Sequence, residues 1–287
     1  MDASKSNGVT MLTNEQREKR RHGVGASDTP IIMGFSSYKT PYQLYLEKIN
    51  PIAVTEDETA VQHWGNLLEP VIRKEFVNKN DLIVTLPETI YHAEKRYMLA
   101  NLDGYIPAVD AVLEIKTCNA FQGNEWGAEG SDQIPMQYLI QVAHQCIVAD
   151  CTKAYIAVLI GGNDYRQYIY ERDAELEGLI HDAVDNFWLN HVVPLVEPAS
   201  ITIDDSRIKY RNVIPASTRY VNSQINQQVN DLMDLRHKKK QLEKEEERAK
   251  MLVMEYMQHA ECLLDGGGKP VVTLKANAKG NRVFLLK

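Results

Sequence analysis

Apolar residues along this chain follow two different periods, and each period predicts a different kind of element. Helical spacing of apolar side chains, beginning at a capping residue or a proline, predicts four helices, at residues 41–49, 59–78, 135–146 and 173–189. A further helix start lies at Thr13–Gln16. In the helix at 59–78 the helical rhythm predicts that the core face consists of Val61, Trp64, Leu68, Val71 and Ile72.

Short apolar runs bounded by turn residues predict the strands. We expect them at residues 82–86, 89–92, 97–100, 112–116, 153–160 and 165–171. The last two flank Gly161–Asp164, which is typical of a β-hairpin. Helices and strands that alternate in this way indicate an α/β or α+β fold, in which helices pack against a sheet.

The C-terminal part of the chain has a different pattern. Prolines mark a linker over residues 196–221, which separates a globular domain over 1–195 from a charged extension over 222–287. Apolar residues from Ile225 to Met257 keep a helical rhythm within the extension, and this predicts one long helix or a helical hairpin that serves oligomer or partner contacts. A small terminal hairpin is expected around Asn277–Gly280.

Composition limits the class of protein. The hydrophobic share of 44% and charged share of 25% are ordinary for a globular protein in water, and no apolar run is long enough to span a bilayer. The N-terminus lacks the apolar core of a signal peptide, and the four cysteines form neither a CxxC pair nor a zinc-ligand pattern, so we expect reduced thiols and a cytoplasmic location. A net charge of −7 neither establishes nor excludes binding to DNA, because local basic patches decide that.

Candidate chemistry is concentrated at residues 101–117. Side chains of a strand alternate between its faces, so Glu114 and Lys116 share one face of the predicted strand, and Leu113 and Ile115 share the other. Asp103 lies in a preceding Asp-Gly turn, from which its carboxylate could meet that of Glu114 and hold a hard cation. The alternative is that both acids are surface charges of a hairpin.

Two other segments could bind phosphate. The glycine-rich loop Gly23–Asp28 follows Arg20 and Arg21 and precedes a predicted helix that has Pro30 in its first turn, with Ser27 or Asp28 as its cap. In the helix at 135–146 a polar stripe could contact a phosphate backbone or bases, and it consists of Gln137, Tyr138, Gln141 and Gln145. Glu69 follows Gly65 by one helical turn, and a lone glutamate there is most often a surface charge.

These segments, in this order, resemble one family. The order is Arg20–Asp28, Gly65 with Glu69, Asn101–Gly104, Glu114–Lys116, and Tyr138 with Gln141. It is similar to the YqaJ-like viral recombinases, relatives of the bacteriophage lambda exonuclease within the PD-(D/E)XK nuclease superfamily. The resemblance covers roughly residues 14–190. It implies a nuclease core in which helices flank a central mixed sheet.

The resemblance also implies roles for individual residues. Asp103 and Glu114 would bind Mg²⁺, or Mn²⁺ as an alternative, together with the backbone carbonyl of Ile115. Lys116 would orient or help deprotonate the attacking water, and Glu69 would complete the acidic site. The group that grips the terminal 5′-phosphate would comprise Arg20 or its neighbour Arg21, with Ser27, Asn101, Tyr138 and Gln141.

The implied activity is a Mg²⁺-dependent 5′→3′ exonuclease that acts on ends of double-stranded DNA and leaves 3′ overhangs for a single-strand annealing protein in phage-type recombination. By the same resemblance the protein would form a ring, expected to be a trimer, in the cytoplasm of a bacterial host, with a phage or prophage origin. Two alternatives stay open at this point. One is an endonuclease of the same superfamily, and the other is a DNA-binding or scaffold protein without catalysis.

Overall fold

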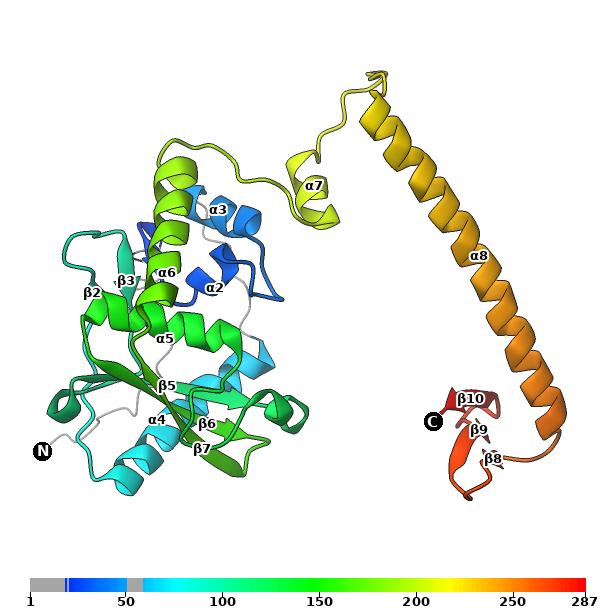
Figure 1. The fold of residues 1–287 in the computed structure, drawn as a ribbon, viewed down its shortest axis with the longest axis horizontal. Helices are drawn as coiled ribbons and strands as arrows, with labels where there is room; N and C mark the ends of the chain where they lie inside the picture. Colours follow the sequence, from blue (N-terminus) through cyan, green and yellow to red (C-terminus); the bar gives the residue numbers. More distant parts are fainter. Residues whose placement is uncertain (1–18, 20, 51–58) are drawn as a thin grey trace, which may run out of the picture. The chain divides into compact units, whose positions relative to one another are not determined.

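The computed structural model of the protein describes residues 19, 21–50 and 59–287, and it divides into two units (Figure 1). The first unit ends at Asn212, and the second comprises Val213–Lys287. The predicted helix start at Thr13–Gln16 lies outside the described residues.

A four-stranded mixed sheet forms the centre of the first unit. Its strands lie in the order β4 (Gly104–Ile106), β5 (Ala111–Cys118), β6 (Lys153–Ile160) and β7 (Asp164–Glu171). β5 and β6 pair in parallel, whereas β4 with β5 and β6 with β7 pair antiparallel. The strand predicted at 112–116 and the hairpin predicted around Gly161–Asp164 are therefore confirmed.

Helices cover both faces of this sheet, as Figure 1 shows. A parallel pair needs a crossover connection, and α5 (Met136–Ala149) supplies it between β5 and β6. On the same side as α5 the core also includes residues of α3 (Pro41–Ile49) and α6 (Ala174–Phe187), while α4 (Ala60–Asn80) packs on the opposite face. Strand alternation divides the two cores, since Val112 belongs to the first and Leu113 and Ile115 to the second.

The predicted core face of α4 was partly wrong. Ile72 and Phe76 are buried, but Val61, Trp64 and Val71 are 77%, 61% and 59% exposed. The sheet contacts the second half of the helix, so the apolar residues of its first turns have no sheet beneath them. Val71 directly precedes Ile72 and therefore points about 100° away from it around the helix.

A second, three-stranded sheet brings the N-terminal loop to the segment before Asp103. β1 (Val24–Gly25) pairs in parallel with β3 (Met98–Ala100), which pairs antiparallel with β2 (Ile90–Tyr91). The strand predicted at 82–86 is reduced to one bridge, between Thr85 and Tyr105. The remaining short elements of this unit are α2 (Thr29–Ile32), 3₁₀ turns at Pro107–Val109 and Ala120–Glu125, and a π-helical turn at Trp188–Val192.

The predicted linker contains a helix, α7 (Ile203–Lys209), that is attached to the first unit. Thr202 and Asp205 form a reciprocal capping box at its start. Asp205 is fully buried and accepts a hydrogen bond of 2.7 Å from the Thr40 hydroxyl. Sequence reading missed α7 because it is shorter than two turns and most of its apolar residues stay exposed.

The second unit consists of one long helix and a small antiparallel sheet. α8 (Ser223–Met257) is continuous, which decides between the two predicted forms of this segment. The expected terminal hairpin is formed by β9 (Pro270–Ala276) and β10 (Arg282–Leu286), and β8 (Cys262–Leu264) adds a strand that was not expected. In the part of the chain that the structure describes, no helix combines the length and apolar character needed to cross a membrane.

Candidate functional site

Strand β5 presents two charged side chains on one face, as the alternation predicts. Glu114 is 2% exposed, and its Oε1 lies 2.5 Å from the Lys116 ammonium. Asp103 comes from the turn between β3 and β4, and its Oδ2 accepts a hydrogen bond of 2.8 Å from the Ile115 amide. The Ile115 amide can donate to Asp103 because β4 pairs with β5 only as far as Leu113, so no residue of β4 lies opposite Ile115. The turn carboxylate is thus fixed beside the strand that carries the other two groups.

Two glutamines of α5 hold the Glu114 carboxylate from the other side. Gln141 donates from Nε2 to Oε1 at 2.5 Å, and Gln145 donates from Nε2 to Oε2 at 2.6 Å. These residues are four apart and therefore lie on one face of the helix. The sequence predicted contacts between this stripe and a phosphate or bases, but the structure places both amides on a carboxylate.

The third acid, Glu69, comes from α4 and is paired with Arg73 one turn later. Arg73 also donates from Nε to the backbone carbonyl of Asp103 at 2.8 Å. One guanidinium therefore joins the helix acid to the turn that carries Asp103. Arg73 was not among the predicted site residues, although its spacing of four residues from Glu69 was a signal in the sequence.

The electrostatics of the site show mutual repulsion among its acids. Removal from water, followed by the charges of Glu114 and Glu69, raises the pKa of Asp103 well above its ordinary value. The pKa of Glu69 is also raised, first by burial and then by Glu114, against the opposing effect of Arg73. Burial lowers the pKa of Lys116, but the charges of Glu114 and Asp103 outweigh this effect and raise it overall.

This donor set fits a hard divalent cation. The carboxylates of Asp103, Glu114 and Glu69 repel one another across the site. The two cationic side chains, Arg73 and Lys116, neutralise only part of this negative charge. No cluster of three His, Cys, Asp or Glu side chains stands ready for a metal among the residues that the structure describes. Mg²⁺ does not need one, because it keeps several waters and takes one or two carboxylates together with substrate oxygens.

An aromatic pair lies beside the lysine. The Lys116 ammonium is 5.0 Å from the centre of the Tyr138 ring, and Tyr138 stacks on Trp126 at a centroid distance of 5.5 Å. Burial raises the pKa of the Tyr138 phenol. Tyr138 was predicted to contact DNA, and the structure places it next to Lys116 at the start of α5.

The residues predicted to grip a 5′-phosphate are only partly brought together. Arg20 lies outside the described residues, and Arg21 donates from its guanidinium to the Asn50 carbonyl at 2.7 Å. Ser27 is exposed in the glycine-rich loop, while Asn101 accepts a hydrogen bond of 2.8 Å from the Thr89 hydroxyl. The parallel pairing of β1 with β3 places the start of this loop beside the strand that leads into Asn101.

The loop is anchored by an ion pair that the sequence did not reveal. Asp28 accepts from the Gly25 amide at 2.9 Å and from the Lys48 ammonium at 2.7 Å, and the side chains of Asp28 and Lys48 are 7% and 5% exposed. Asp28 occupies the cap position of α2 but makes no side-chain capping bond, because its carboxylate turns to Gly25 and Lys48 instead. Lys48 is 20 residues away along the chain, so no local pattern predicts the pair.

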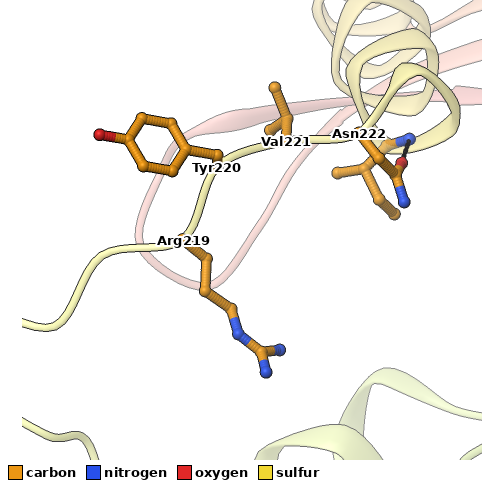
Figure 2. A pocket seen from close by; sticks show the side chains of 5 residues that line it. Arg219, Tyr220, Val221 and Asn222 are labelled. Carbon is orange, nitrogen blue, oxygen red and sulfur yellow. Dashed lines mark hydrogen bonds between the residues drawn. The ribbon is translucent and has the colours of Figure 1, made fainter.

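A pocket in the second unit has no acidic side chain in its lining. Figure 2 shows its lining at the start of α8, where the Asn222 side chain accepts a hydrogen bond of 2.8 Å from the Ile225 amide; its residues are Arg219, Tyr220, Val221, Asn222 and Ile225. None of these side chains is a carboxylate.

Comparisons with known proteins agree with this architecture. Residues 17–152 match the YqaJ-like viral recombinase domain. The uncharacterized protein YqaJ of Bacillus subtilis (strain 168) is 38% identical over 192 residues, which is 66% of this chain and 59% of that protein, so the chain matches less than two thirds of its relative's length. The alkaline exonuclease of Laribacter hongkongensis has the same fold at 19% identity, with a TM-score of 0.52 and coverage of 64% of this chain and 94% of that one. Its complex with dAMP gives 19% identity and a TM-score of 0.51, and covers 69% and 98% of the two chains.

Proposed function

We propose that this protein is a metal-dependent exonuclease that degrades one strand of linear double-stranded DNA in the 5′→3′ direction, and the match of residues 17–152 to the YqaJ-like viral recombinase domain supports this proposal. One observation carries the proposal, namely the convergence of Asp103, Glu114 and Lys116 beside Glu69 at strand β5 of the mixed sheet. The shared fold with an alkaline exonuclease that was also solved with dAMP supports a deoxynucleotide product.

Asp103 and Glu114 would hold Mg²⁺, with Mn²⁺ as an alternative, together with the carbonyl oxygen of Ile115. When bound, such an ion acidifies water and neutralises charge that develops on the phosphate. Glu69 would position water on the side of the site that Arg73 braces. Lys116 remains protonated at neutral pH because the acids raise its pKa, so it offers a positive charge to the scissile phosphate and a donor that orients the attacking water.

The glutamines of α5 have a positioning role in this scheme. Each donates an amide N–H to one oxygen of Glu114, so the carboxylate keeps one orientation. The Tyr138 ring lies 5.0 Å from the Lys116 ammonium and offers it a cation–π contact. Together these contacts prearrange the acid and the lysine before substrate arrives.

A time course on end-labelled linear duplex, with and without Mg²⁺, tests the proposal. We expect mononucleotide release that requires the metal, together with a growing 3′ single strand. Glu114→Gln and Lys116→Met should each lower the rate at least about a hundredfold, whereas the exposed Glu171→Gln on β7 should retain it. Full activity in either site variant would overturn the site assignment. Cutting of closed circular DNA would show an endonuclease, and metal-independent binding without product would show a non-catalytic protein.

The end-recognition group is a separate part of the proposal. Arg20→Ala and Arg21→Ala should be compared on duplexes that carry either a 5′-phosphate or a 5′-hydroxyl. The arginine that grips the end should lose the preference between these substrates when it is replaced. An unchanged ratio in both variants would exclude this role for the pair.

The products and partners extend the same proposal. The 3′ overhangs would serve a single-strand annealing protein in phage-type recombination, and a ring, expected to be a trimer, would enclose the DNA. The ring is tested by sedimentation of the full chain with duplex DNA. The annealing step is tested by adding a single-strand annealing protein to resected duplexes that share complementary ends.

A further inference from the structure

Helix α8 carries a row of exposed apolar side chains at regular intervals. Along it, Ile225, Leu232, Leu235 and Leu242 are 50%, 51%, 62% and 64% exposed. Successive gaps in this row are seven, three and seven residues, and Ala249 follows after seven more. These gaps are those of the a and d positions of a heptad repeat, with Ile225 and Leu232 at a and the other three at d.

Little within its own unit covers this row. Every residue from Ser223 to Leu252 is exposed, and the helix packs against the terminal sheet only near its end, through Val253 and Met257. A narrow a/d row suits a seam between helices better than the wider apolar face that a helix turns to a domain core. Most helices in proteins are stabilised by the packing of their apolar face, so we expect a partner to cover this row.

We propose that α8 forms a parallel, in-register coiled coil with α8 of a second copy of this chain. The charges that flank the seam indicate that the partner is a second copy of this chain. In a parallel coiled coil the g position of one helix faces the e position five residues later on its partner. At this spacing α8 has three pairs, all of opposite sign: Asp231 with Arg236, Lys238 with Glu243, and Glu245 with Lys250.

This complementarity has no use within one helix, because side chains five residues apart do not face each other. In an antiparallel pair e positions face e positions, and the charges then depend on the register. With position 235 opposite position 253, Arg236 would approach Lys250 of the other copy, whereas one heptad away it would approach Glu243. The in-register parallel pairing makes all three flanking pairs attractive, and cross-linking separates it from both antiparallel registers.

Two seam positions are charged and restrict the pairing further. Lys239 and Glu246 occupy a positions, and each is paired within its own helix, with Glu243 at 3.8 Å and Lys250 at 2.5 Å. A charged a position costs stability but fixes register and the number of helices.

Cross-linking of the full chain tests the geometry. Leu235→Cys puts a thiol at a d position, where two parallel helices bring equivalent residues together, while the matched control His237→Cys puts one on the outer face. Under mild oxidation we expect a disulfide-linked dimer from the first variant and little from the second, with the bridge mapped to position 235 of both copies by mass spectrometry. The native cysteines are common to both variants. Equal cross-linking of the two, or none at position 235, would overturn the proposal, because an antiparallel pair places position 235 opposite an a position of the other copy, such as 246 or 253, and not opposite position 235.

Charge reversal tests the choice of partner. Asp231→Arg and Arg236→Asp each make a flanking pair repulsive in a parallel dimer, and the double variant restores attraction. Both changes place opposite charges within one turn on the same helix, next to Asp234 or next to Lys239 and Lys240. Asp231→Arg also removes the hydrogen bond that Asp231 accepts from Gln227 at 2.8 Å, so the double variant is compared with this single variant. By analytical ultracentrifugation we expect each single variant to raise the dissociation constant of the α8 contact about four- to thirtyfold and the double variant to restore it. Single variants that associate like the parent chain, or a double variant that stays as weak as the singles, would contradict pairing with a second copy.

Discussion

A drop in pH should destabilise the first unit through one buried histidine. His144 of α5 is fully buried, and its Nε2 lies 3.2 Å from the Leu99 carbonyl, which can only accept a hydrogen bond. Nδ1 therefore accepts from the Thr29 hydroxyl at 2.7 Å. The neutral ring joins the helix that holds Glu114 to α2 and to β3. A second ring proton would put a donor on Nδ1, so the Thr29 hydroxyl would have to accept where it now donates.

The size of the effect follows from the pKa of this ring. Burial lowers the pKa of His144 from 6.5 to about 4. The unfolded chain takes up this proton first as the pH falls, so the stability that the neutral ring contributes is complete above pH 6.5 and is lost as the pH falls toward 4. Linkage between these two values gives a loss of about 2 kcal/mol in the free energy of unfolding between pH 7 and pH 5.

Urea denaturation followed by tryptophan fluorescence measures this loss selectively, because Trp64, Trp126 and Trp188 all belong to the first unit. The control is His144→Gln, whose amide can donate to Leu99 and accept from Thr29 but does not titrate. Other groups titrate alike in both proteins, so the parent chain should lose about 2 kcal/mol more than the variant over this interval. Equal losses in the two proteins would refute the assignment of a buried neutral ring.

Three other outcomes follow from the same structure. Arg73→Met, which leaves Glu69 without its ion-pair partner and frees the turn before β4, should lower the exonuclease rate roughly ten- to a hundredfold and also destabilise the first unit, whereas the exposed neighbour Lys74→Met should do neither; equal rates in the two variants would contradict the bracing role. Gly23→Ala would place a Cβ 2.5 Å from the Tyr97 carbonyl oxygen and should cost about 1–3 kcal/mol in chemical denaturation, while Gly178→Ala in α6 meets no atom within 4 Å and should be neutral or stabilising. Chelation with EDTA should stop hydrolysis and added Mg²⁺ should restore it, and activity that persists through exhaustive chelation would contradict the metal assignment.

The local sequence pattern was sufficient to predict those features that depend only on the element to which a residue belongs. The alternation of β5 put Glu114 and Lys116 on one face, and the glycine turn between β6 and β7 fixed a hairpin. The same reasoning failed on α4, where helical spacing identified an apolar face but not how much of it meets the sheet. Exposure of Trp64 depends on where the sheet ends, which no residue of α4 encodes.

The same distinction between local and long-range features applies to the candidate site. The sequence by itself determined the acids and the lysine, the order of the motifs, and a charged C-terminal segment with a helical rhythm, because spacing within one element is enough to place these features. Only the tertiary structure decided that Gln141 and Gln145 bind Glu114, that Arg73 joins Glu69 to the Asp103 turn, and that Lys48 anchors Asp28. Each of these contacts joins residues of different elements that a parallel crossover and two sheets bring together. The sequence cannot show them because long-range packing, and not local propensity, determines which polar groups meet when water is removed.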